Sequence, residues 1–267
     1  MLKSERRNEG RALPAIALLV TAAVSVCEPA GAAGDSLFIG EIVVEDNRTT
    51  TLPQQALHYT LTHNDPERLA SQLAGWIPTP VRHGNDVSFR LDAYPVAQTP
   101  EADGSHLASS FLIDYTEPSI RGLRPLIESR YGRQPSPGDL EQFVYASIED
   151  KNAARGFDVA SIVAQSRSGD CSEHAVLLTA LLRMYGYPAR TVLGIYVSLQ
   201  EPVMAYGHAW AEYRTRTGWT GIDGTRIDDS VGVHYIPLGV IRDESIAYRL
   251  AVAGVLHGLS IERIRVE

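Results

Sequence analysis

Hydrophobic positions recur with helical spacing across residues 165–187, and this stretch carries the clearest structural prediction in the chain. Gly169 and Asp170 interrupt the pattern that precedes them, and apolar residues then recur every third or fourth position after Cys171. The recurring positions are Ala175, Leu178, Leu182 and Tyr185. Further apolar residues lie between them, so the pattern predicts a helix that is buried on most sides.

Both ends of this helix carry sequence signals. Asp170 suits the N-cap and Glu173 follows three residues later, which is a capping-box arrangement. Gly186 and Pro188 end the helix. Cys171 therefore lies in the first turn, where backbone N–H groups lack partners within the helix and the helix dipole stabilises a thiolate. A cysteine at this position is a candidate nucleophile, and a buried inert thiol is the alternative.

The part of the chain before residue 118 has the pattern of strands separated by turns. Short runs of β-branched, aromatic and aliphatic residues alternate with prolines and with Asn-Asp and Asp-Gly pairs, and Asp65–Gly75 allows one short helix. The predicted strands are Leu37–Val44, Ala56–Thr62, Val87–Leu91 and Ser110–Tyr115. We therefore expect a small all-β domain over residues 34–117.

From Pro118 onward the pattern is helical up to the cysteine helix and mostly strand-like after it. Helices are expected from Pro125, after Ser136 and after Asp158. The later elements are strands at Thr191–Val197, Tyr206–Tyr213 and Trp219–Asp223, an extended segment at His234–Ile241, a helix at Glu244–Leu256 and a strand at Leu259–Val266. Helices followed by antiparallel strands indicate an α+β domain over residues 118–267.

Composition and the N-terminal residues indicate which partners and which cellular compartment to expect. The formal net charge of −8 gives no reason to expect nucleic acid or an anionic membrane as a partner. Residues 1–33 have a basic start, an apolar stretch at Ala12–Val26 and small residues up to Ala33, which is typical of an export signal. We expect a periplasmic or secreted protein, with an uncleaved membrane anchor as the alternative. Cleavage after Ala33 removes Cys27 and leaves Cys171 as a lone thiol in an oxidising compartment, which favours a chemical task for it.

The first predicted strand pair after the cysteine helix supplies partners for a thiol. Alternation along residues 207–212 places His208 on the same face as Trp210 and Glu212, and Asp223 lies near the end of the next strand. Neighbouring strands of a hairpin are close enough for a carboxylate to hold an imidazole. A set of Cys171, His208 and Asp223 has the groups that thiol acyl transfer needs.

The same groups together with His174 have donor types that zinc accepts. A thiol at a helix start and a carboxylate on a hairpin fit acyl transfer without a metal. We therefore expect neither a metal nor a cofactor.

Three short motifs, in order and at plausible spacing, resemble the transglutaminase-like superfamily. They are Gly169-Asp170-Cys171, Gly207-His208-Ala209-Trp210, and Gly218-Trp219 leading into Asp223-Gly224-Thr225, and residues 181–190 are similar to the bacterial helix-to-strand passage of that family. The resemblance covers residues 137–226 and implies a papain-like fold in circularly permuted order. It implies Cys171 as the nucleophile, His208 as the base and Asp223 as the orienting carboxylate. Gly224 departs from the proline that is common in the family, which loosens the turn and keeps the carboxylate.

The expected activity is formation of a thioester between Cys171 and a carbonyl of a protein or peptide substrate. Water as the acceptor makes a peptidase or amidase, and an amine makes a cross-linking transglutaminase; analogy with bacterial members of the family favours hydrolysis. A non-catalytic binding or scaffold module that retains the fold is the alternative from another class. The backbone N–H of Cys171 is the natural first oxyanion donor, and Gln165 is a candidate second one.

Overall fold

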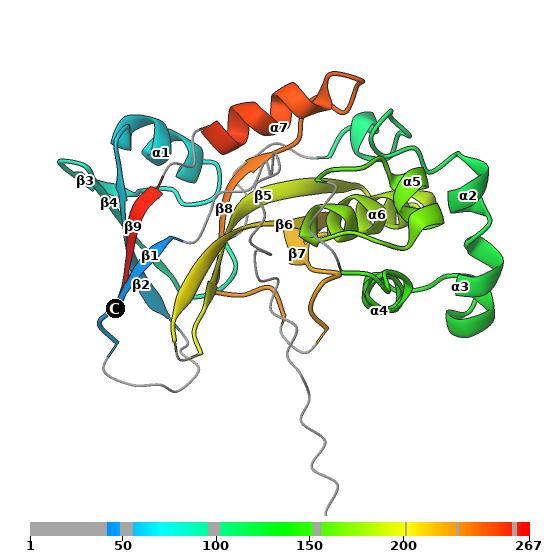
Figure 1. Cartoon of the computed structure of the whole chain (residues 1–267), viewed down its shortest axis with the longest axis horizontal. Helices are drawn as coiled ribbons and strands as arrows, with labels where there is room; N and C mark the ends of the chain where they lie inside the picture. The colour runs from blue at the N-terminus through cyan, green and yellow to red at the C-terminus, as the bar shows by residue number, and fades with distance from the viewer. Residues whose placement is uncertain are drawn as a thin grey trace, which may run out of the picture.

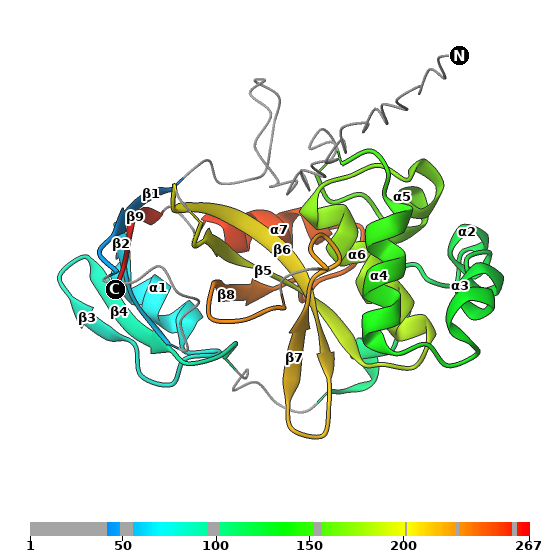
Figure 2. The same ribbon diagram turned by 90° about the horizontal axis from the view of Figure 1, so that it is seen from below.

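A computed structural model describes residues 42–48, 56–95, 102–151, 156–200, 202–227, 230–257 and 261–267. The predicted export signal and most of the predicted strand Leu37–Val44 lie outside these residues. Figures 1 and 2 show two sheets side by side, with α1 next to the sheet that contains β1 to β4 and helices α2 to α6 gathered at the opposite end of the molecule. The mixed α+β class predicted from the sequence is confirmed. None of the helices in the described ranges is long and apolar enough to cross a lipid bilayer.

A four-stranded antiparallel sheet occupies the middle of the molecule, in the order β7-β6-β5-β8. Its strands are β5 (Ala189–Ser198), β6 (Met204–Arg214), β7 (Trp219–Ile222) and β8 (Tyr235–Val240). Helix α6 (Cys171–Met184) packs against β6. Because side chains alternate along a strand, Ala209 and Ala211 lie in the core that contains α6, whereas Trp210 lies in the other core.

The remaining helices cover α6 and complete its core. They are α2 (Pro118–Arg121), α3 (Arg124–Tyr131), α4 (Pro137–Ser147) and α5 (Ala160–Ser166), and α7 (Tyr248–His257) contacts β8. Helix α4 begins as expected, because Ser136 and Asp139 form a reciprocal capping box around Pro137. The side chains of Ala175, Leu178 and Leu182 on α6 are buried, so the predicted burial of this helix on most sides is confirmed.

The five-stranded sheet has the order β1-β9-β2-β4-β3 and takes its strands from both ends of the chain. They are β1 (Val43–Asp46), β2 (Leu57–His63), β3 (Val81–His83), β4 (Asp86–Leu91) and β9 (Ile261–Val266), and α1 (Pro66–Leu73) packs beside them. Strand β9 pairs in parallel with β1 and antiparallel with β2. Strand β9 lies after the predicted boundary at residue 117, and β1 to β4 lie before it. This sheet therefore contains strands from both sides of that boundary.

The predicted strand Ser110–Tyr115 is wrong. The backbone bends there, because the Ser110 hydroxyl accepts a hydrogen bond from the Ile113 N–H and the Tyr115 N–H bonds to the Ile113 carbonyl. Leu112 and Ile113 are fully buried, and Leu112 bonds through its backbone to Ala160 and Glu244. The apolar run reflects burial against the helices and not pairing in a sheet.

A buried polar network joins the four-stranded sheet to the segments that follow α1 and β4, beside the other sheet. Glu212 on β6 accepts hydrogen bonds from Trp76 Nε1 at 3.0 Å and Tyr94 Oη at 2.6 Å. Its other oxygen accepts from Arg190 Nε at 2.6 Å. Trp210 Nε1 donates to Tyr94 Oη at 2.9 Å, which extends the network across the sheet. The Arg190 guanidinium is thus ion-paired with Glu212 in the interior.

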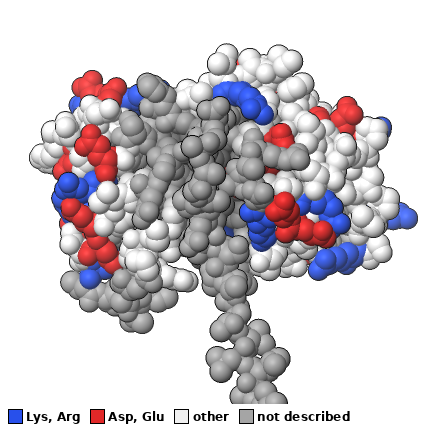
Figure 3. All heavy atoms as spheres, viewed as in Figure 1, with Lys and Arg blue, Asp and Glu red and all other residues white. Residues whose placement is uncertain are grey.

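On the face drawn in Figure 3, acidic and basic side chains are interspersed over the described surface. They do not gather by sign into one large field on that face. The formal net charge of the protein is −8. The described surface in this view has no extended basic area that would attract a polyanion.

Candidate active site

Helix α6 begins at Cys171, and its N-terminus is tightly capped. Asp170 Oδ1 accepts the Ser172 N–H at 2.8 Å, while Glu173 Oε2 accepts the Asp170 N–H at 3.0 Å, so the predicted capping box is confirmed. Cys171 is only 3% exposed and forms no disulfide within the described residues. The thiol thus lies at the positive end of a helix, in surroundings largely screened from water.

The structure brings His208 and Asp223 into direct contact. His208 lies on β6 and Asp223 directly follows β7, and His208 Nε2 is 2.8 Å from Asp223 Oδ2. Burial by itself raises the pKa of Asp223, but the charge of His208 and hydrogen bonds from His208 and Thr225 outweigh it and lower that pKa to about 2. The carboxylate is therefore ionised near neutral pH and accepts a hydrogen bond from the Nε2–H of the imidazole.

Other groups hold the same carboxylate. Asp223 Oδ1 accepts the Thr225 N–H at 2.9 Å and the Thr225 hydroxyl at 2.7 Å. Asp223 Oδ2 also accepts the Tyr235 hydroxyl at 2.8 Å, and the Asp223 N–H donates to Glu141 Oε1 at 3.1 Å. The Asp-Gly-Thr turn makes the Thr225 contacts foreseeable from the sequence, whereas Tyr235 and Glu141 carry no local signal.

Cys171 is placed on the helix that packs against the strand carrying His208. Its side chain belongs to the same buried cluster as Ala209, the chain neighbour of His208. Alternation along β6 turns the His208 side chain to the face opposite Ala209, so this shared cluster does not by itself place the sulfur beside the imidazole. The contact between the Cys171 thiol and the His208 ring itself stays a prediction.

Aromatic rings enclose His208. The ring centroids of Tyr196, Trp210 and Tyr235 lie 5.8, 6.0 and 5.8 Å from that of His208. Trp210 is fully buried, which favours core packing over the lining of a substrate groove. These rings restrict the orientations that the imidazole can take while it bonds to Asp223.

His174 lies one turn after Cys171 and is bound locally. Its Nδ1 is 2.6 Å from the Asp170 carbonyl, to which it donates, and burial lowers the pKa of His174 to about 4. The ring is therefore neutral near pH 7. Within the described residues, no group of three or more His, Cys, Asp and Glu side chains is arranged to hold a metal ion.

Glu173 is a buried acid that also connects helix α6 to the segment before it. Its Oε1 accepts the Asp158 N–H at 2.9 Å, and the Ser172 hydroxyl lies 2.9 Å from its Oε2. Burial, followed by the charge of Asp170, raises the pKa of Glu173 to about 8. Sequence reasoning identified Glu173 as a capping residue, but its raised proton affinity depends on burial that only the fold creates.

Replacing Glu173 by glutamine is expected to change how stability depends on pH. The folded protein keeps a proton on Glu173 that the unfolded chain releases above its ordinary pKa of 4.5, so stability falls as pH rises from there through about 8. Glutamine mimics the protonated acid, so the variant should lose that decline. Urea unfolding at about pH 6.5 and about pH 8 measures it. The exposed Glu67 supplies the control Glu67→Gln, and an unchanged decline in Glu173→Gln would contradict the assignment.

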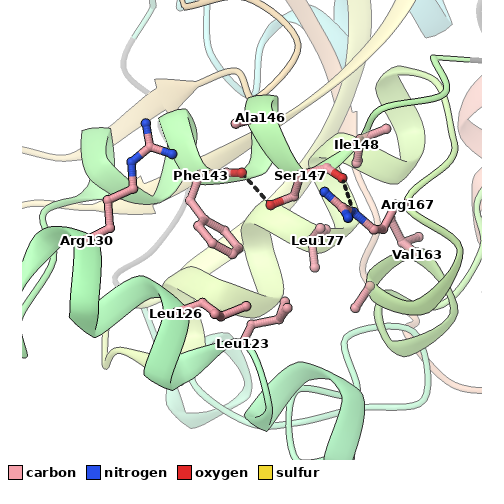
Figure 4. A pocket seen from close by; sticks show the side chains of 11 residues that line it. Leu123, Leu126, Arg130, Phe143, Ala146, Ser147, Ile148, Val163, Arg167 and Leu177 are labelled. Carbon is pink, nitrogen blue, oxygen red and sulfur yellow. Dashed lines mark hydrogen bonds between the residues drawn. The ribbon is translucent and has the colours of Figure 1, made fainter.

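Two cavities lie elsewhere in the described structure. One, of about 300 Å³, has an apolar floor between α3, α4 and α5, with Arg130 and Arg167 at its margins (Figure 4). The other, of about 570 Å³, is lined by polar groups that include Arg183 and Glu244. None of the three candidate catalytic residues lines either cavity. The side chain of Gln165, the candidate second oxyanion donor, is exposed on α5, and its role stays a prediction.

Residues 131–224 match the family model described as the transglutaminase-like superfamily, and no curated protein matches the chain. A candidate cysteine protease from Cytophaga hutchinsonii is 14% identical with a TM-score of 0.45, and the match covers 85% of this chain and 82% of that one. The periplasmic domain of TgpA from Pseudomonas aeruginosa bound to ethylmercury is 21% identical with a TM-score of 0.35. A second structure of that domain is 22% identical with a TM-score of 0.34.

The TgpA matches cover 53% of this chain, and 55% and 53% of the two TgpA chains, so this chain spans about half the length of that domain. The match to the family model contains the first two sequence motifs, the third as far as Gly224, and the residues Cys171, His208 and Asp223. Residues 131–224 therefore carry the sequence pattern of the transglutaminase-like superfamily.

Proposed function

We propose that the protein is an exported thiol acyl-transfer enzyme that hydrolyses peptide or glutamine carboxamide bonds through a thioester on Cys171. The observation that carries the proposal is the 2.8 Å contact between His208 and Asp223, next to the helix that begins at Cys171. A carboxylate held on one ring nitrogen orients the imidazole and selects its tautomer. Cys171 at the helix start supplies the nucleophile that this pair would serve.

The proposed reaction begins with attack of the Cys171 thiolate on the substrate carbonyl carbon. The carbonyl oxygen becomes an oxyanion, which the Cys171 backbone N–H stabilises at the helix N-terminus. When the oxyanion collapses, the C–N bond breaks and the amine or ammonia leaves with a proton from His208. A thioester on Cys171 remains.

Water then attacks the thioester while His208 takes up its proton, and the C–S bond breaks to release the acid and the thiolate. Asp223 accepts from Nε2, so Nδ1 is the ring nitrogen that carries the moving proton. The imidazole thus returns to its starting protonation state after each cycle. If a primary amine replaces water as the acceptor, the same thioester yields a cross-link.

Two alternatives keep the same fold. A cross-linking transglutaminase differs only in the acceptor, which is selected outside the triad. A binding or scaffold module would have no use for a thiol at a helix start together with an imidazole that is hydrogen-bonded to an ionised carboxylate. The retention of these three groups favours an enzyme, and hydrolysis rests on analogy with bacterial members of the family.

Alkylation of Cys171 by iodoacetamide tests the proposal. We expect labelling, located by mass spectrometry, to exceed that of glutathione well below the ordinary thiol pKa of about 8.5. A His208→Ala variant should lose this low-pH reactivity, and Cys171→Ala should show no adduct in that peptide. Labelling no faster than glutathione at any pH would overturn the proposed nucleophile.

The acceptor needs a separate assay. Glutamine-containing peptides are incubated with the protein in the presence and absence of a primary amine. Ammonia release or peptide cleavage without the amine supports hydrolysis. Incorporation of the amine in preference to water would replace hydrolysis by cross-linking and leave the role of Cys171 unchanged.

A further inference from the structure

Tyr235 shares one oxygen of Asp223 with His208. The Tyr235 hydroxyl donates to Asp223 Oδ2 at 2.8 Å, and His208 Nε2 lies 2.8 Å from that same oxygen. Thr225 occupies the other oxygen with its backbone N–H and its hydroxyl. Each oxygen of the carboxylate thus accepts two hydrogen bonds, and only Oδ2 is engaged by a residue of β8.

Tyr235 is held firmly in place. It is fully buried near the start of β8, and its ring centroid lies 5.1 Å from that of Tyr196, 5.3 Å from that of Trp210 and 4.9 Å from that of His234. Burial, followed by the charge of Asp223, raises the pKa of Tyr235 far above its ordinary value. The hydroxyl therefore remains a proton donor across the whole working range of pH.

We propose that Tyr235 is a positioning residue that fixes the Asp223 carboxylate toward His208 and limits how strongly this carboxylate raises the proton affinity of the imidazole. The inference rests on the proposed function, because it assigns a role to the imidazole in a thiol reaction. A donor on Oδ2 draws negative charge away from the His208 side of the carboxylate, so the imidazolium is stabilised less than by an undivided charge. The same donor prevents the carboxylate from rotating away from Nε2.

Other ionisable groups surround this pair and remain constant in the comparison of variants. They are His174 on α6, Glu141 on α4, Tyr196 on β5, Arg226 after β7 and His234 before β8. Among them, Glu141 bonds to the backbone of Asp223, and the Arg226 guanidinium lies 4.5 Å from the centroid of the Tyr196 ring. Removing one hydroxyl leaves all of these charges in place.

The test compares the His208 pKa in the full-length protein and in a Tyr235→Phe variant. NMR titration, with signals assigned from His208→Ala, should show the His208 pKa rising by about one unit in the Phe variant. The pH profile of Cys171 alkylation should move in parallel, because the imidazole takes part in ionising the thiol. A loss of fold alone would not produce a coordinated shift of both curves.

Two further variants serve as a control and as a second test of the hydrogen bond. Tyr59 is a buried tyrosine whose hydroxyl donates to the Val233 carbonyl at 3.0 Å, so Tyr59→Phe removes a similar hydrogen bond and should leave the His208 pKa unchanged. Site-specific 3-fluorotyrosine at position 235 is a stronger donor of the same shape and should lower the His208 pKa. This substitution also serves if the Phe variant does not fold.

The outcomes separate the two proposals. An unchanged His208 pKa in both Tyr235 substitutions, with a reactive Cys171 in the wild type, overturns the inference and leaves the proposed function standing. An unreactive Cys171 in the wild type overturns the proposed function. In that case, a shifted His208 pKa would still establish the hydrogen bond but not its role in a reaction.

Discussion

A Glu212→Leu variant is expected to lose about 3–5 kcal/mol of unfolding free energy, because it leaves a buried charge without its partner. Arg190 and Glu212 are ion-paired at 2.6 Å with side-chain exposures of 5% and 0%. Glu212 also accepts hydrogen bonds from Trp76 and Tyr94, so the substitution leaves two further buried donors without an acceptor. Urea unfolding at neutral pH measures the loss.

The exposed pair of Arg167 and Glu149 supplies the control for this variant. These side chains are 52% and 66% exposed, so Glu149→Leu should change stability by less than about 1 kcal/mol. Adding Arg190→Met to Glu212→Leu should restore part of the loss, because the pair is then replaced by apolar groups of similar size. If Glu212→Leu lowered the unfolding free energy no more than Glu149→Leu does, the hydrogen bonds and ion pair of Glu212 would not stabilise the fold.

An Asp223→Asn variant is expected to slow the thiol chemistry by about two to four orders of magnitude. Asp223 is ionised and accepts a hydrogen bond from His208 Nε2–H. An asparagine amide can donate to Nε2 instead, which moves the ring proton to Nδ1 and removes the base that faces the thiol. The rate of acylation by p-nitrophenyl acetate, a small activated ester, measures the effect without a known natural substrate.

Two further variants serve as controls, one for ester hydrolysis without the thiol and one for the loss of a carboxylate elsewhere. Cys171→Ala gives the rate of ester hydrolysis that does not involve the thiol. Asp139→Asn removes a carboxylate that caps α4 at the molecular surface and should leave the rate within about twofold of the wild type. A rate for Asp223→Asn equal to that of Asp139→Asn would show that the carboxylate does not serve the reaction.

Local signals predicted the elements of the family region well. Helix α6 begins at Cys171 with Asp170 as its N-cap, and strands overlap all three of the ranges predicted after it. These features depend on apolar spacing and on capping side chains that act within a few residues. The error at Ser110–Tyr115 has the same origin, since a short apolar run does not reveal whether its backbone pairs with a strand or only packs.

Contacts between distant segments were beyond such reasoning. Strand β9 lies between β1 and β2, although more than half of the chain separates it from either of them. Tyr235 and Glu141 reach Asp223 from elements that carry no motif. Nothing in the spacing of residues around positions 141 or 235 indicates what they face after folding.

The sequence by itself determined which groups could do chemistry: a thiol at a helix start, an imidazole on a strand and a carboxylate at the next turn. Capping, periodicity and short motifs act over a few residues, so they are readable along the chain. Only the tertiary structure decided that His208 bonds to Asp223, that Tyr235 shares this carboxylate and that Glu212 joins the four-stranded sheet to the segments that follow α1 and β4. Those contacts follow from how the two cores bury their apolar faces together, and that depends on the whole chain at once.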